Sequence, residues 1–116
     1  MNNENRSKNP DGVWEISVEE VHANLGKFHL IDVRREEEYY GELGHIKGAQ
    51  LSTLQTSFQD EVEGFSADGV YVFVCRSGQR SSVAGAMAME KGVALAYNMV
   101  GGMLAWNEKK LPVEKD

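Results

Sequence analysis

The segment VYVFVCRSGQRSS (residues 70–82) contains the only cysteine of the chain, Cys75. Its first five residues are apolar and mostly β-branched or aromatic, which is typical of a strand buried on both faces. From Ser81 onward the composition favours a helix, which Gly92 should end as a C′ residue. We therefore expect Cys75 where a central strand ends and a helix is about to begin. In an open α/β sheet, ligands bind at this place because unpaired N–H groups of the helix N-terminus converge on an anion.

The loop after Cys75 favours a reactive thiolate over an inert buried thiol. Gly78 permits a tight turn with a positive φ, so that successive amides can point inward as an anion-binding nest. Arg76 and Arg80 add positive charge, and so does the dipole of the following helix. A lone cysteine within an apolar run is usually an inert core residue. The polar sequence that follows Cys75 argues against that interpretation here.

Length and composition indicate a single domain with an ordinary core. The chain has 116 residues, of which 41% are hydrophobic and 26% are charged, and a domain of this size buries roughly 65% of its unfolded surface. The formal net charge of -6 argues against nucleic acid or an anionic membrane as a partner, because both require a basic face. A small anionic substrate remains compatible with this charge, since two arginines and the loop amides set the local field at Cys75.

The cysteine and histidine counts argue against a disulfide and a metal site. One cysteine excludes an intrachain disulfide, and the three histidines, His22, His29 and His45, have no metal-binding spacing. We expect no cofactor and a reduced, cytoplasmic setting. The apolar runs are too short for a membrane span. Residues 1–12 lack the apolar core of a secretory signal and are predicted to be a disordered polar tail.

Strand and helix patterns alternate over residues 13–111, and residues 112–116 form a C-terminal tail. Strands are predicted at 13–16, 28–33, 49–51, 70–74 and 94–99. The intervening helices are predicted at 17–25, 36–40, 54–62 and 81–91, with a last helical region after residue 100. This order predicts an α/β domain with a mainly parallel sheet of about five strands and helices on both faces.

The loop CRSGQRS (residues 75–81) resembles the active-site loop of the rhodanese, or sulfurtransferase, family. Three outer segments also resemble motifs of that family: DVR (32–34), GHIKGA (44–49) and GGMLAW (101–106). The resemblance covers the chain from about residue 13 to 111 and implies a rhodanese-like three-layer domain. It also implies structural, loop-supporting roles for Asp32 and Arg34.

The resemblance implies a sulfurtransferase in which Cys75 is the nucleophile. Its thiolate would take a sulfane sulfur from thiosulfate or a related small anion, form a persulfide, and pass the sulfur to cyanide or to a thiol, including a protein thiol. The expected anion cradle consists of Arg76, Ser77, Gly78, Gln79 and Arg80. Within it, Arg80 is expected to brace the loop and Arg76 to hold the donor.

Ser81 is expected to support the loop by capping the following helix; a catalytic hydroxyl is the weaker interpretation.

Two alternatives to the enzyme remain open. The chain could be a persulfide carrier or binding module that serves a protein partner. A Cys-dependent phosphatase or arsenate reductase is disfavoured, because those phosphatases place five residues between cysteine and arginine, whereas four separate Cys75 from Arg80. The absence of a histidine directly before Cys75 disfavours it further.

Overall fold

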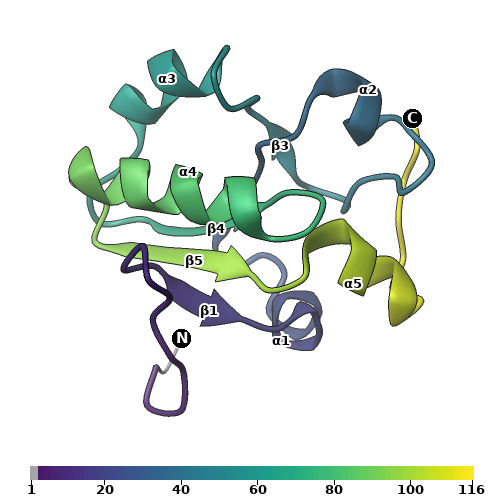
Figure 1. Cartoon of the computed structure of the whole chain (residues 1–116), viewed down its shortest axis with the longest axis horizontal. Coiled ribbons are helices and arrows are strands. Elements are labelled where there is room, and N and C mark those ends of the chain that lie inside the picture. Colours follow the sequence, from purple (N-terminus) through teal and green to yellow (C-terminus); the bar gives the residue numbers. More distant parts are fainter. Residues whose placement is uncertain (1–2) are drawn as a thin grey trace.

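Five parallel strands form one sheet in the computed structural model, which describes residues 3–116 (Figure 1). Their order in the sheet is β1-β5-β4-β2-β3. The strands are β1 (Trp14–Ile16), β2 (His29–Asp32), β3 (Gln50–Leu51), β4 (Val70–Val74) and β5 (Leu95–Met99). The predicted α/β class with a parallel sheet is confirmed.

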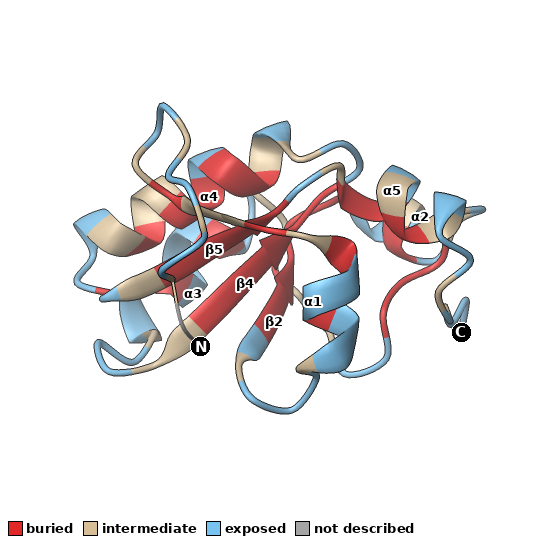
Figure 2. Ribbon diagram, turned by 90° about the horizontal axis from the view of Figure 1, so that it is seen from below, coloured by how far each residue is buried: buried red, intermediate tan, exposed pale blue. Residues whose placement is uncertain are grey.

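Helices cover both faces of this sheet, as the sequence predicts. They are α1 (Val18–Ala23), α2 (Glu36–Tyr39), α3 (Phe58–Glu61) with the 3-10 turn η1 (Val62–Gly64), α4 (Gln79–Glu90) and α5 (Gly102–Glu108). Buried residues of α3 and α4 pack in one hydrophobic cluster, and those of α1 and α5 pack in a second. Figures 1 and 2 show these pairs of helices on opposite sides of the sheet.

Strand β4 lies in the middle of the sheet and is buried on both faces (Figure 2). Tyr71 and Phe73 belong to the cluster beneath α3 and α4, whereas Val72 and Val74 belong to the cluster beneath α1 and α5. Alternate side chains of a strand point to opposite faces, so an unbroken apolar run is what a doubly covered strand requires. The interpretation of residues 70–74 as a central strand is therefore confirmed.

The first helix begins as predicted but ends earlier. The Ser17 side chain accepts a hydrogen bond from the Glu20 amide at 3.2 Å and so caps the helix N-terminus. The helix ends at Ala23, and Leu25 is 40% exposed. The prediction that this helix continues to Leu25 is wrong, because the chain turns before Leu25 reaches the buried face.

Residues 3–12, for which the sequence predicts a disordered polar tail, fold back along β1 in this structure; Met1 and Asn2 lie outside the described residues. The Glu15 amide donates to the Ser7 carbonyl, and the Asn9 amide donates to the Val13 carbonyl, both at 2.9 Å. The physical reason is that β1 is an edge strand, whose open backbone groups gain partners from this segment. Within residues 3–116, no helix is both long and apolar enough to cross a membrane.

Candidate active site

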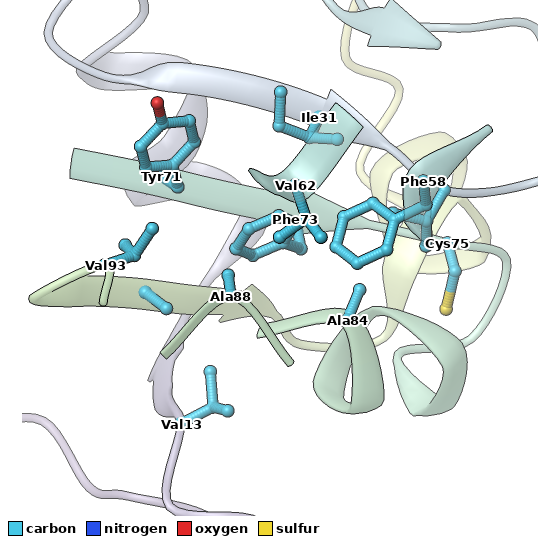
Figure 3. Packing of buried hydrophobic residues seen from close by; sticks show 12 residues of the cluster. Val13, Ile31, Phe58, Val62, Tyr71, Phe73, Cys75, Ala84, Ala88 and Val93 are labelled. Atoms are coloured by element: carbon cyan, nitrogen blue, oxygen red, sulfur yellow. The ribbon is translucent and has the colours of Figure 1, made fainter. Parts of the chain in front are cut away.

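Cys75 lies directly after β4, at the end of the core cluster that includes Phe58 and Ala84 (Figure 3). Its side chain is buried, and the residue is 1% exposed. The Gly78 amide donates a hydrogen bond to Cys75 Sγ at 3.1 Å. Gly78 has φ 101° and is the N-cap of α4, so the loop turns through a conformation that glycine adopts without strain. The predicted place of the cysteine, between a central strand and a helix, is confirmed.

Two glycines at the start of α5, Gly101 and Gly102, let this helix approach the backbone of the loop closely. The Met103 amide donates to the Cys75 carbonyl at 2.9 Å, and the Leu104 amide donates to the Arg76 carbonyl at 3.0 Å. Gly102 has φ +57°, and a Cβ atom built there would overlap both of these carbonyl oxygens. The first turn of α5 therefore fixes the two residues that begin the loop.

Ser81 does not cap α4, which corrects the expectation from the sequence. Gly78 occupies the N-cap position, and the helix begins at Gln79, so Ser81 lies within the first turn. Its side chain is fully buried, with Oγ 3.2 Å from Cys75 Sγ and 2.5 Å from Asn98 Oδ1. The structure thus places the Ser81 hydroxyl against the sulfur instead of against the helix end.

Arg80 is held by a bidentate ion pair with Glu38 of α2. Arg80 Nη1 and Nη2 donate to Glu38 Oε1 and Oε2 at 2.7 and 2.9 Å. This hydrogen bond is the main reason why the pKa of Glu38 is lowered from 4.5 to about 2, against the opposing effect of burial. The same bond raises the pKa of the Arg80 guanidinium, and negative charge on Cys75 adds to that effect. The ion pair thus ties Arg80, at the start of α4, to α2.

Asp32 and Arg34 form the buried support behind that ion pair. Both residues are 1% exposed, and Arg34 Nη2 donates to Asp32 Oδ2 at 2.8 Å. Arg34 also donates to the carbonyls of Glu38 and Gly44, at 3.2 and 2.7 Å. The bond to the Glu38 carbonyl therefore fixes the position of α2, and α2 in turn carries the carboxylate that holds Arg80.

Three other residues of the expected anion cradle lie on the exposed side of the loop. Arg76, Ser77 and Gln79 are exposed, and within residues 3–116 the amide that donates to Cys75 Sγ is that of Gly78. Arg76 lines a cavity of about 380 Å³ together with Arg34 and three glutamates of the α2 region, Glu37, Glu38 and Glu42. A second cavity, of about 270 Å³, has Arg35 and Arg80 in its lining.

The geometry is that of a thiol at a helix N-terminus, next to one amide and one hydroxyl, in a loop whose Arg80 is paired with Glu38. Comparison with known protein families matches residues 17–109 to the Rhodanese-like domain. The chain belongs to the rhodanese-like family. The matched residues include β2, β4, the Cys75 loop and α5, so the sequence resemblance to this family is confirmed.

Relatives of this rhodanese-like chain include proteins named sulfurtransferases. It is 32% identical over 114 residues to the human thiosulfate:glutathione sulfurtransferase, covering 85% of this chain and 97% of the relative. It is 35% identical over 86 residues to the putative sulfurtransferase YtwF of Bacillus subtilis (strain 168), covering 74% of this chain and 80% of the relative. The crystal structure of a rhodanese-related protein from Thermoplasma volcanium superposes with a TM-score of 0.78 at 22% identity, covering 88% and 98% of the two chains. That structural similarity supports the assignment of the fold.

Three residues of the rhodanese-like site were not predicted from the sequence. The sequence indicates only that Glu38 belongs to a helix at 36–40, yet its carboxylate holds Arg80. Asn98 was included in an apolar strand, and Glu15 in the first strand. An asparagine that interrupts a buried strand is a usable signal, because a buried amide must find hydrogen-bond partners. Among residues 3–116, no group of histidine, cysteine and carboxylate side chains is arranged to hold a metal ion.

Proposed function

We propose that this rhodanese-like chain transfers a sulfane sulfur from thiosulfate, or a related small anion, to a thiophilic acceptor through a persulfide on Cys75. The observation that carries this proposal is the environment of the sulfur. Cys75 Sγ lies at the N-terminus of α4, with the Gly78 amide at 3.1 Å and the Ser81 hydroxyl at 3.2 Å. The Gly78 amide and the dipole of α4, both aimed at the sulfur, stabilise negative charge there.

The reaction proceeds in two balanced halves. The Cys75 thiolate attacks the outer sulfur of thiosulfate, the new S–S bond forms, and the original S–S bond breaks with its electron pair leaving on sulfite. The acceptor, cyanide or a thiolate, then attacks the outer sulfur of the persulfide, and Cys75 leaves as a thiolate. Covalent catalysis of this kind predicts ping-pong kinetics.

Two positive groups have separate roles in this proposal. Arg80 is paired with Glu38 and braces the loop. Arg76 is exposed and follows Cys75 directly in the chain, so its guanidinium can hold the oxygens of a donor anion that approaches the sulfur. The amides of the cradle residues Ser77, Gly78 and Gln79 are expected to stabilise the outer sulfur of the persulfide, which extends beyond Sγ.

The test is a panel assay of the purified chain with thiosulfate, mercaptopyruvate and a phosphoester, each with the Cys75→Ser variant as control. We expect turnover of a sulfur donor with cyanide or a thiol, and none in the variant, because a hydroxyl is a far weaker nucleophile at neutral pH. Circular dichroism should show that the variant is folded. Hydrolysis of the phosphoester without sulfur transfer would contradict the proposal. Persulfide formation only with a protein donor would indicate a carrier instead of a free-standing enzyme.

A further inference from the structure

A chain of polar side chains runs from Cys75 to the edge strand of the sheet. Ser81 Oγ lies 3.2 Å from Cys75 Sγ and 2.5 Å from Asn98 Oδ1. Asn98 Nδ2 donates to Glu15 Oε2 at 2.8 Å. Ser81 and Asn98 are 0% and 4% exposed, so water does not replace these partners. The sulfur is thus connected to a carboxylate of β1 through two buried side chains.

The carboxylate of Glu15 determines which way the Asn98 amide faces. A carboxylate accepts hydrogen bonds and has no proton to donate, so it must bind the NH2 end of the amide. Glu15 and Asn98 are paired in register on the neighbouring strands β1 and β5, which keeps both side chains on the same face of the sheet. The amide oxygen of Asn98 therefore points to Ser81 and accepts its hydroxyl proton.

The Ser81 hydroxyl has one proton and two neighbours that can accept it. When it donates to Asn98, it presents a lone pair to Cys75, and this arrangement suits a protonated S–H group. A thiolate needs the opposite arrangement, with the hydroxyl turned to Sγ. Asn98 Oδ1 would then be a buried acceptor without a donor, which is unfavourable.

We propose that Glu15 and Asn98 are positioning residues that hold the Ser81 proton away from Cys75 and so oppose negative charge on the sulfur between turnovers. This inference rests on the proposed function, in which Cys75 is the nucleophile. These hydrogen bonds would protect Cys75, because a neutral thiol is oxidised less readily than a thiolate. The Gly78 amide, Arg80 and the helix dipole favour the thiolate. The hydrogen-bonded series of Ser81, Asn98 and Glu15 weakens their effect.

The thiolate fraction at neutral pH tests this proposal directly. The chain has one cysteine, so the ultraviolet absorbance of the thiolate, measured against Cys75→Ser, reports Cys75 alone. Glu15→Gln removes the acceptor-only partner and lets the Asn98 amide flip; Asn98→Leu removes the competing acceptor without changing the charge. Each should raise the thiolate-to-thiol ratio by roughly fivefold, the factor that corresponds to one hydrogen bond of about 1 kcal/mol. Glu19→Gln, at an exposed carboxylate of α1, is the control for the lost charge.

The decisive comparison repeats these variants in a Ser81→Ala background. Because both residues act through the Ser81 proton, the effect of Asn98→Leu should disappear there, and Glu15→Gln should retain no more than the effect of Glu19→Gln. Equal effects with and without the hydroxyl, or a lower thiolate fraction in the single variants, would overturn the proposal. If Asn98→Leu does not fold, Glu15→Gln at the half-buried edge strand decides the question. The measurement needs no sulfur transfer, so its failure is distinguishable from failure of the proposed function.

Discussion

Replacing Glu38 by glutamine removes the charge from the ion pair that holds Arg80 against α2. Both guanidinium nitrogens of Arg80 bind this carboxylate, at 2.7 and 2.9 Å. The pKa of Glu38 is lowered from 4.5 to about 2, so the folded state binds the proton more weakly than the unfolded chain does. The stabilisation is therefore fully present above about pH 4.5 and is lost as the pH falls towards about 2.

The magnitude follows from that pKa and from the exposure of the pair. A lowering from 4.5 to about 2 corresponds to an upper limit of about 3.4 kcal/mol, at about 1.36 kcal/mol per pH unit. The Arg80 side chain is 38% exposed and that of Glu38 is 19% exposed, so solvent screens part of the interaction. We expect Glu38→Gln to lower the free energy of unfolding by about 1–2 kcal/mol at neutral pH.

Urea denaturation of the wild type and Glu38→Gln from neutral pH to acid measures this effect. The difference between the two should be constant above about pH 4.5 and shrink towards zero near the pKa of about 2. Glu37→Gln is the matched control. Glu37 is the residue next to Glu38, its side chain is 73% exposed, and its carboxylate lies 3.8 Å from Arg35 Nε. A difference between wild type and Glu38→Gln that does not change with pH, or an equal effect of Glu37→Gln, would refute the role of this pair.

Two further predictions concern the loop. Arg76→Ala should raise KM for an anionic donor with little change in kcat, whereas Arg80→Ala should lower kcat, because it releases the brace on the loop; wild-type kinetics in both variants would exclude both arginines from the site. Gly102→Ala should lower the free energy of unfolding by about 2–4 kcal/mol, because its φ of +57° is strained for alanine and the added Cβ overlaps the loop carbonyls. Gly64→Ala, where a Cβ meets nothing within 4 Å, should change it by less than about 0.5 kcal/mol in the same urea titration. Similar losses in the two glycine variants would show that the close approach of α5 does not matter.

The arrangement around Cys75 could be predicted because its signals are local in the sequence. An apolar run, a glycine and a helix-forming segment follow one another within residues 70–91, and each element forms near the predicted position. The prediction that Ser81 caps α4 is wrong for an equally local reason. Gly78 in the left-handed conformation begins the helix earlier than a serine cap would, so the hydroxyl turns to the sulfur.

The supporting contacts could not be predicted because they join distant parts of the chain. Glu38 and Arg80 are separated by 42 positions, and Glu15 and Asn98 by 83. Neither pair has a spacing that indicates contact; the strand order of the sheet brings Glu15 beside Asn98. The path of the N-terminal segment along β1 could not be predicted either, because its polar composition does not show that an edge strand offers it backbone partners.

Intact-mass measurement after incubation with thiosulfate alone tests the persulfide most directly. The chain has one cysteine, so no second thiol can resolve a persulfide on Cys75 into an intrachain disulfide, and the loaded form should persist. We predict a gain of the mass of one sulfur atom, its loss on addition of cyanide or a small thiol, and no gain in Cys75→Ser. Turnover of thiosulfate by a protein whose mass never increases would contradict the account and remove Cys75 from the role of nucleophile.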